Sequence, residues 1–452
     1  MQTDTVQHSS NVKTLPERFT SSGFILAAIG SAVGLGNMWK FPYITGKYGG
    51  AAFFLLFIGC LLFVGLPILL AEMAIGRGGR GNAVTSFQSL SKSKYWGAFG
   101  FLSVVGAFAI LSFYAVVAGW TIHYAIESLT GGLYASSDFK STFLTFAGGY
   151  LPVLWQAVTM VITGWVVAKG ISGGIEKFNK VLIPGLAIIL IILMVRALTL
   201  DNAAAGVEFF LKPDFSKLTA ESALIALGHA FFSLSLGMGT MLTYGAYVER
   251  QQSLGKASLA IGGGDLLYAL VAGLIIFPTA FSFGIEPSQG AGLVFMALPA
   301  AFAAMPLGQF FGFLFFILLA IAALTSAVSL LEVPVAYAMT KWNWNRKKAA
   351  FYTSVICFLI GVPSALSMGP LADFAPGGKT YFDWFDFVAS NILLPIGGLL
   401  VTLFTGYAWK RAGEEAGLSG FWYNAWMFLL RYVAPLLVIA IFFYTVGIIK
   451  FD

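Results

Sequence analysis

The sequence has little charge for its length. Only 10% of its 452 residues are Asp, Glu, Lys or Arg, whereas soluble globular domains carry about 25%. So few charges cannot cover a globular surface with polar side chains, which excludes a soluble enzyme or binding domain as the main class. Hydrophobic residues make up 58% of the chain, and we conclude that its main partner is a lipid bilayer.

Cysteine and histidine are also scarce. Cys60 and Cys357 each lie alone in an apolar run, which indicates neither a disulfide framework nor a metal cluster. His8, His123 and His229 lie far apart in the sequence, which also disfavours a transition-metal site. Because no Cys/His or Glu/His constellation is present, we do not expect an enzyme.

Long hydrophobic runs fill most of the chain. Each has about the 20 residues that a helix needs to cross the hydrocarbon core. Eleven such runs are centred near residues 33, 62, 110, 160, 190, 235, 270, 323, 358, 396 and 437. The first 20 residues are polar and lack the apolar core of a signal peptide. The sequence therefore predicts an all-α polytopic membrane protein with eleven transmembrane helices.

The basic residues predict the orientation in the membrane. With a cytoplasmic N-terminus, two basic clusters fall on the cytoplasmic side, as the positive-inside rule requires. They are Arg77, Arg80, Lys92 and Lys94, and Lys341, Arg346, Lys347 and Lys348. An odd number of spans then places the C-terminus outside. The formal charge of +6 is thus a topology signal, and we expect a bacterial cytoplasmic (inner) membrane protein with no nucleic-acid partner.

Two of the predicted spans are interrupted by glycine. Residues 30–37 read GSAVGLGN in the first span, and residues 231–239 read FFSLSLGMG in the sixth. Irregular backbone at this depth survives only where it lines a cavity enclosed by protein. Close packing of small residues against neighbouring helices is the alternative explanation. Breaks five spans apart favour two inverted five-helix repeats with a binding site between them.

The interpretation as two inverted repeats divides the chain into four parts, and we expect no separate soluble domain. Residues 1–19 form a cytoplasmic N-terminal segment and residues 20–200 the first five-helix repeat. Residues 218–410 form the second, inverted repeat, and residues 424–450 the eleventh helix.

Three motifs resemble the neurotransmitter:sodium symporter family. They are GSAVGLGNMWKFP at residues 30–42, FFSLSLGMG at 231–239 and AALTS at 322–326. The similarity extends from about residue 17 to the end and is closest to bacterial members with eleven helices that carry hydrophobic amino acids. A bacterial member of this family is also a standard example of inverted repeats with discontinuous helices. The resemblance implies a sodium-coupled symporter for hydrophobic L-amino acids that works by alternating access, as a monomer or weak dimer.

The resemblance implies two sodium sites built from oxygen ligands. The first comprises Ala32, Asn37, Ser233 and a residue of the seventh span, which is Asp265 here. The second comprises the carbonyls of Gly30, Val33 and Ala322 with the hydroxyls of Thr325 and Ser326. From the residues alone, such hydroxyls usually bond a carbonyl one turn back.

Asp265 departs from the family, which commonly has Asn at this position. A carboxylate within a span is costly and usually faces a cavity or an ion pathway. The alternative is an Asp near a helix end, hydrated or capping, after Gly262, Gly263 and Gly264. Because chloride-dependent relatives hold an anion beside this sodium, we expect Asp265 to supply the charge and transport to be independent of chloride.

The residues around the breaks also predict the substrate. Monoamine-carrying relatives have an aspartate at the position of Gly34, so this chain should bind a ligand that brings its own carboxylate. Met238 stands where the leucine-selective relative has a phenylalanine, which suggests that the site accepts a broad range of hydrophobic side chains. The resemblance implies the substrate residues Ser31, Ala32, Leu35, Gly36, Ile110, Tyr114, Phe232, Ser233, Ser235, Met238, Ser326 and Leu330. Read singly, most of these would be ordinary core residues.

Four residues match gate positions of the family. Lys40 and Asp386 correspond to the outer gate, and Arg18 and Tyr247 to the inner gate. The family has an acidic residue as the partner in the inner gate, but the corresponding residue here is Thr340. The ion pair of the inner gate is therefore not assigned from the sequence. Glu72 and Glu332 are interpreted as buried structural hydrogen-bonding groups.

The fifth span suggests a hinge between Gly174 and Pro184. Proline leaves the carbonyl of Lys180 without its helical donor. The alternative is that Gly173 and Gly174 form the loop and that Pro184 simply lies early in a helix, where proline is tolerated.

Two other interpretations remain open at this point. A non-transporting amino-acid sensor would keep the same binding residues, and a symporter for another small zwitterion would keep the same fold.

Overall fold

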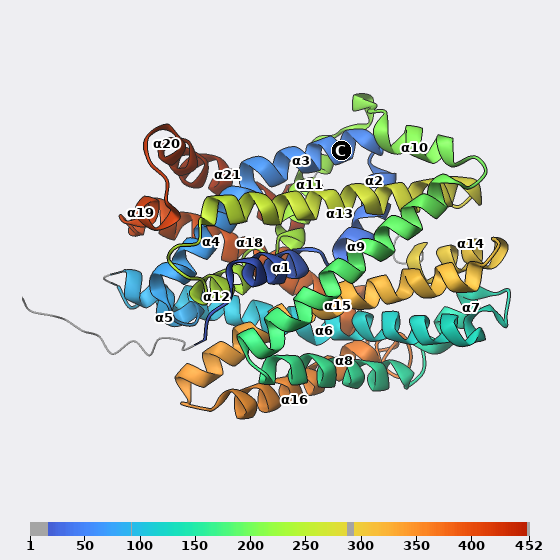
Figure 1. Cartoon of the computed structure of the whole chain (residues 1–452), viewed down its shortest axis with the longest axis horizontal. Helices are drawn as coiled ribbons and strands as arrows, with labels where there is room; N and C mark the ends of the chain where they lie inside the picture. The colour runs from blue at the N-terminus through green and yellow to red at the C-terminus, as the bar shows by residue number, and fades with distance from the viewer. Residues whose placement is uncertain (1–16, 92, 287–292, 450–452) are drawn as a thin grey trace, which may run out of the picture.

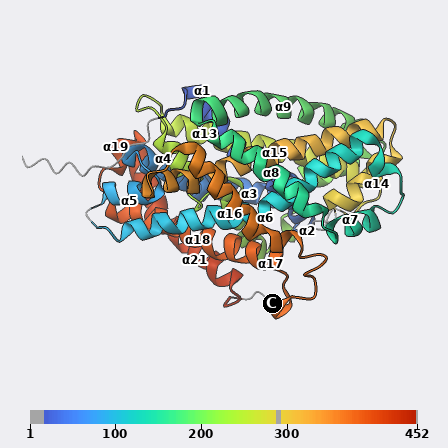
Figure 2. The same cartoon turned by 90° about the horizontal axis from the view of Figure 1, so that it is seen from below.

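The computed structural model describes residues 17–91, 93–286 and 293–449, and all regular structure within these ranges is helical. The long helices run side by side along the longest axis of the molecule (Figure 1). Short helices lie at its two ends. In both views α5 (Ala83–Leu90) and α19 (Ala412–Ala416) lie at one end, and α7 (Phe139–Ala147) and α14 (Leu298–Ala304) at the other (Figure 2).

Nine continuous helical stretches of the described chain are long and apolar enough to cross a membrane. They are Ala51–Gly79 (α3, η2 and α4), Trp96–Thr130 (α6), Leu151–Ala168 (α8), Ile171–Leu198 (η4 and α9), Leu254–Ser282 (α13), Gly308–Lys341 (α15), Arg346–Ala365 (α16), Tyr381–Ala408 (α17, η8, α18 and η9) and Gly420–Thr445 (α20, η10 and α21). A tenth is formed by α1 (Ser21–Ala32) together with η1 (Gly36–Lys40) and α2 (Phe41–Lys47), which are bent by 41°. The multi-pass, all-helical class predicted from the sequence is confirmed.

The predicted sixth span consists of two separate helices, α11 (Ala220–Ser233) and α12 (Thr240–Ala246). Ser235, Gly237 and Gly239 between them have φ angles of 55°, 79° and 74°. These left-handed conformations end the helix, and glycine adopts them at no steric cost. Whether the pair forms one further span, and so the predicted eleventh, stays a prediction.

Shorter elements connect the spans. They are η3 (Gly132–Tyr134), α10 (Ala203–Leu211), η5 (Phe215–Lys217), η6 (Leu293–Ala297) and η7 (Pro376–Gly378).

The interrupted helices lie inside the bundle. The chain at the α1 break, residues 33–35, is buried, and α1 packs against α9, α13 and α15. The outer face of α9 is apolar and exposed, with Val181, Ile188 and Ile191 each more than half exposed. Lipid-facing helices have such faces. The irregular backbone is therefore enclosed by protein, as its polar groups require.

The fifth span begins before Gly173 and Gly174, which were considered as a possible loop. The turn lies at Gly170, with φ of 94°, and the helix begins at Ile171. Gly173 and Gly174 lie inside the π-helical turn η4 (Ile171–Glu176), which continues into α9 (Lys177–Leu198). The loop reading is therefore wrong, and the stretch from Gly174 to Pro184 is helical.

Candidate ion and substrate site

The break in α1 faces α6 and α15 without room for a side chain at its centre. A Cβ atom on Gly34 would lie 2.8 Å from Ser326 Oγ and 3.3 Å from the Tyr114 hydroxyl. The backbone N–H of Leu35 donates to that same hydroxyl at 3.3 Å. The glycine therefore permits close approach of three helices, and an aspartate at residue 34 would displace both neighbours.

Three of the four residues predicted for the first sodium site form one buried cluster. The side-chain amide of Asn37 donates to Asp265 Oδ1 at 2.7 Å. The Ser233 hydroxyl lies 2.7 Å from the same oxygen and 3.1 Å from Asn37 Oδ1. These residues come from η1, α11 and α13, so the helix breaks bring them together. Ala32, the fourth, is buried at the last residue of α1.

Asp265 lies in the interior of α13, not near its end. Its side chain is fully buried, and its second oxygen, Oδ2, has no hydrogen-bond partner among the described residues. The hydrated or capping alternative is therefore wrong. An unpartnered buried carboxylate oxygen is costly unless a cation or donor meets it. With neighbouring amide and hydroxyl oxygens, this set fits a hard cation such as sodium.

The residues predicted for the second sodium site also converge. The Ser326 hydroxyl lies 3.4 Å from the Gly30 carbonyl and 3.2 Å from the Ser31 carbonyl. The Thr325 hydroxyl donates to the Ala322 carbonyl at 3.0 Å, the local bond expected from sequence alone. Each hydroxyl oxygen keeps free lone pairs after donating. Val33 is buried directly after α1. This oxygen-only arrangement also fits sodium.

A small cavity lies beside the cluster of Asn37, Ser233 and Asp265. Eleven of the twelve predicted substrate residues line it, Leu35 being the exception, and Gly34 and Asn37 line it as well. Its volume is about 20 Å³, close to the space that one water molecule needs. An amino acid can enter only if the surrounding side chains or helices move apart.

Phe232 covers one side of this cavity. A Cβ atom on Gly36 would lie 2.9 Å from the Phe232 ring, so the glycine allows the ring to lie against η1. Lys40 Nζ lies 5.3 Å from the centre of the same ring. Among the described residues no ion pair within 4 Å joins Lys40 to Asp386, whose carboxylate accepts from Ser390 at 2.7 Å. The predicted outer-gate pair is thus not in contact here, although Asp386 is near enough to attract Lys40.

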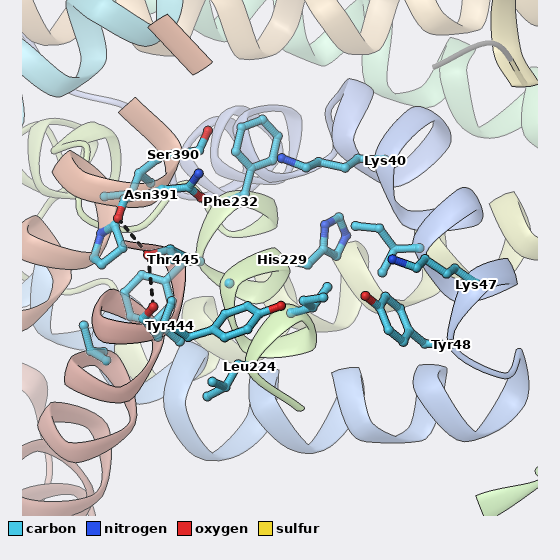
Figure 3. A pocket seen from close by; sticks show the side chains of 18 of the residues that line it. Lys40, Lys47, Tyr48, Leu224, His229, Phe232, Ser390, Asn391, Tyr444 and Thr445 are labelled. Carbon is cyan, nitrogen blue, oxygen red and sulfur yellow. Dashed lines mark hydrogen bonds between the residues drawn. The ribbon is translucent and has the colours of Figure 1, made fainter. Parts of the chain in front are cut away.

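A larger cavity, of about 310 Å³, lies on the other side of Phe232 (Figure 3). It is enclosed by η1 and α2, by α11, and by α18 and α21. Its labelled side chains include Lys40, His229, Asn391 and Thr445, and the Thr445 hydroxyl donates to the Asn391 carbonyl at 3.3 Å. Both interrupted helices border this space, together with α18 and α21.

The unwound segment of α11–α12 is held by a carboxylate. Glu72, fully buried on α4 (Leu66–Gly79), accepts from the Gly237 amide at 2.6 Å. A Cβ atom on Gly237 would lie 2.3 Å from the Leu394 carbonyl, so α18 fixes the segment from the other side. The structural role predicted for Glu72 agrees with this contact.

An ion-pair network ties the N-terminal segment to the helix bundle. Tyr247 donates to Glu332 at 2.5 Å, and Arg346 bonds the same carboxylate at 2.7 Å. Arg346 also pairs with Glu17 at 2.9 Å. Arg18 instead bonds the carbonyls of Glu17 and Ala246. Glu332 lies about two turns before Thr340 on α15 (Gly308–Lys341), and Arg346 forms the ion pair with it.

Sequence reasoning missed Glu17 and Arg346 in this network. A signal was present, because a carboxylate within a span usually has a charged or hydrogen-bonding partner, and Arg346 belongs to the basic cluster that follows Glu332 in the sequence. Thr340, where an acid was expected, accepts a hydrogen bond from the Asn82 side chain. Asn82 caps α5 through the Thr85 amide. Thr340 therefore contacts the residue that caps α5, and it is not one of the residues described in the ion-pair network.

Comparison with known proteins decides the family. The family model of the sodium:neurotransmitter symporter family matches residues 17–143 and 147–451. The chain belongs to this family. It is 39% identical over 440 residues to the sodium-dependent transporter YhdH of Bacillus subtilis (strain 168), covering 95% of this chain and 97% of that one. A sodium-dependent transporter of Haemophilus influenzae is 36% identical over 437 residues, covering 93% and 95%.

A solved structure supports the same assignment. The crystal structure of MhsT in complex with L-phenylalanine matches with a TM-score of 0.89 at 45% identity, covering 95% of this chain and 99% of that one. This symporter-family member is therefore a sodium-dependent membrane transporter, as the sequence predicted, and not an enzyme.

Proposed function

We propose that this protein is a sodium-coupled symporter for hydrophobic L-amino acids that works by alternating access. The observation that carries the proposal is the cluster of Asn37, Ser233 and Asp265, in which Asp265 Oδ2 has no hydrogen-bond partner among the described residues. Asn37 and Ser233 also line the small cavity. An ion bound by this cluster would therefore lie at the wall of the substrate site, where a substrate carboxylate could join its ligands.

Two sodium ions are proposed. The first would bind Ala32, Asn37, Ser233 and Asp265. The second would bind the carbonyls of Gly30, Val33 and Ala322 and the hydroxyls of Thr325 and Ser326. Each set supplies oxygen atoms only, which hard cations prefer. The fixed charge of Asp265 would make transport independent of chloride.

The substrate would be oriented by its carboxylate and ammonium groups. Its carboxylate would meet the first sodium, the Tyr114 hydroxyl and the amides near Leu35 and Gly36, since helix N-termini attract anions. Its side chain would lie among Ile110, Phe232 and Met238, and the bound L-phenylalanine of MhsT supports this size class. None of the described residues that line the cavity is charged.

The wider architecture follows the same proposal. Eleven spans would form two inverted repeats, residues 20–200 and 218–410, followed by residues 424–450. The N-terminus would be cytoplasmic, in a bacterial inner membrane. The network of Glu17, Tyr247, Glu332 and Arg346 would then close the cytoplasmic side.

Uptake into proteoliposomes tests the proposed function. A sodium gradient should drive accumulation of a radiolabelled hydrophobic amino acid, and hydrophobic members of the twenty amino acids should compete. Binding without accumulation would indicate the sensor alternative. Competition only by a different zwitterion would indicate the other symporter.

The first prediction concerns substrate binding at equilibrium. Replacing sodium by choline should weaken leucine binding at least roughly tenfold, about 1.4 kcal/mol, because a ligand of the carboxylate is lost. Sodium should bind more tightly by the same factor when leucine is present, since coupling is reciprocal. Calorimetric titration in both salts measures the difference, and equal affinities would contradict the proposal.

The helix from Gly174 to Pro184 is proposed as a hinge for sodium release. A Cβ atom on Gly174 would lie 2.1 Å from the Val166 carbonyl, so glycine allows the turn to pack against α8. Pro184 cannot donate to the carbonyl of Lys180. Unwinding between these two points would admit water towards Thr325 and Ser326.

The second prediction tests this hinge. Pro184→Ala restores a backbone donor and should slow turnover about three- to tenfold while leaving equilibrium substrate affinity unchanged. Gly185→Ala is the matched control, because it also favours helix, by about 1 kcal/mol, and meets open space without adding a donor. Proteoliposome turnover and calorimetric affinity are compared. If Pro184→Ala transports at the wild-type rate, the hinge is not used.

A further inference from the structure

Asn179 presents an unexplained amide oxygen inside the bundle. Its side chain is fully buried on α9, and its Nδ2 donates to the Ile175 carbonyl at 2.9 Å. This bond fixes the orientation of the amide, because the reverse orientation would bring two oxygens together. The Oδ1 atom therefore points away from α9, and it has no hydrogen-bond partner among the described residues.

The oxygen points at the helix that carries the proposed second sodium site. A Cβ atom on Gly30 would lie 2.1 Å from Asn179 Oδ1, so the oxygen lies directly against the Gly30 backbone. The carbonyl of Gly30 is a proposed ligand of that site and lies 3.4 Å from Ser326 Oγ. α9 also packs against α15, which carries Thr325 and Ser326. A neutral oxygen acceptor thus lies beside the proposed ion ligands, on the helix opposite them.

Packing alone does not account for this residue. A buried amide oxygen without a donor destabilises the fold, whereas a leucine of similar volume would not. The oxygen lies against the Gly30 backbone, and a Cα–H contact there would compensate only weakly. A side chain retained at a cost to stability in such a place points to a role in function.

The position of Asn179 along α9 suggests when the oxygen is used. It lies midway between Gly174 and Pro184, the proposed hinge points. About one turn earlier, at the end of η4, Glu176 accepts from the Thr20 amide at 3.0 Å and from Lys180 at 2.6 Å, which ties the start of α1 to η4 and α9. When this tie opens, water would reach the Asn179 side chain before it reaches Thr325 or Ser326.

We propose that Asn179 Oδ1 is a transient sodium ligand that receives the ion from the site around Gly30, Thr325 and Ser326 during release through the opened α9. The inference rests on the proposed function. The amide replaces one ligand of the departing ion before its water shell is complete, which lowers the barrier to release. The ion at rest does not need this oxygen, so equilibrium binding is unaffected.

Asn179→Leu is the decisive variant, with Asn179→Asp to restore an oxygen at the same place. Purified full-length protein in proteoliposomes is assayed for turnover, for the sodium concentration that gives half-maximal substrate binding, and for thermal stability. Asn179→Leu should keep or raise the melting temperature and leave the half-maximal sodium concentration within twofold. Its turnover should fall about tenfold. Asn179→Asp should recover at least a third of the wild-type turnover.

Each other result overturns the inference. Wild-type turnover in Asn179→Leu would make the oxygen dispensable, and a tenfold weaker sodium dependence of binding would make it part of the resting site. Slow turnover in both variants would indicate packing and not oxygen chemistry. Asn179→Ala is read by the same criteria if Asn179→Leu does not fold. If liposomes with the wild-type protein do not accumulate substrate, the proposed function itself is contradicted. The sodium dependence of binding and the melting temperatures of the variants are then compared without the turnover data.

Discussion

Asp265→Asn should reduce sodium-dependent uptake in chloride-free buffer by at least about a hundredfold. Two unit charges 4 Å apart attract by about 4 kcal/mol at an effective dielectric constant of 20, and the substitution removes one of them. Asparagine has the same shape and still accepts from Asn37 and Ser233, which bond Oδ1 at 2.7 Å. The loss should therefore come from charge and not from packing.

Chloride distinguishes this explanation from general damage. If Asp265 supplies the negative charge beside the sodium, added chloride should restore part of the uptake of Asp265→Asn and leave the wild type unchanged. Asp201→Asn, at an exposed turn, is the control and should behave as wild type. Uptake is measured in gluconate and chloride buffers of equal sodium concentration. An Asp265→Asn protein that is equally active, or equally inactive, in both buffers would refute the charge-substitution hypothesis.

Arg346→Met should destabilise the protein by about 3–5 kcal/mol, because it leaves a buried charge without its partner. Glu332 is fully buried and Arg346 nearly so, and their side chains lie 2.7 Å apart. Of the described residues that bond this carboxylate, Tyr247 would then remain. The contact between Arg346 and Glu17 would be lost as well, which frees the N-terminal segment.

The double variant separates the buried charge from lost packing. Glu332→Gln in the Arg346→Met background removes the uncompensated charge and should recover most of the stability, while Arg411→Met, which breaks an exposed pair with Glu414, should cost less than about 1 kcal/mol. Melting temperatures in detergent compare the four proteins. An Arg346→Met protein as stable as Arg411→Met would show that the network does not hold the N-terminal segment. Failure of the double variant to recover would assign the loss to packing.

The positions of the helix breaks could be read from the sequence. Gly34 and Gly36 in the first span, and Gly237 and Gly239 in the sixth, weaken a helix wherever they stand, and unpaired backbone inside a membrane must be enclosed. These are local rules, so no knowledge of the packing was needed. The structure has breaks at the same places, and Gly34 also proves to be the point where Ser326 and Tyr114 exclude any side chain.

Pairings between distant segments were harder to predict. Arg346 is 14 residues from Glu332 but 329 from Glu17, and sequence patterns do not encode which long side chains meet when helices pack. The sequence left the ion pair of the inner gate open because the family's acidic position is Thr340 here, and the structure pairs Glu332 with Arg346 while Thr340 bonds Asn82. The contact between Lys40 and Asp386 likewise depends on how far two helices are apart, and here Lys40 lies over Phe232.

The sequence by itself determined the membrane class, the broken helices and the oxygen-rich character of the site, because hydrophobicity, glycine and side-chain chemistry act locally. Only the tertiary structure decided that Asp265 is interior and meets Asn37 and Ser233, that Arg346 joins Glu332 to Glu17, and that Asn179 faces Gly30. Burial and the identity of a partner are properties of packed helices, and some of these partners lie more than two hundred positions apart in the chain.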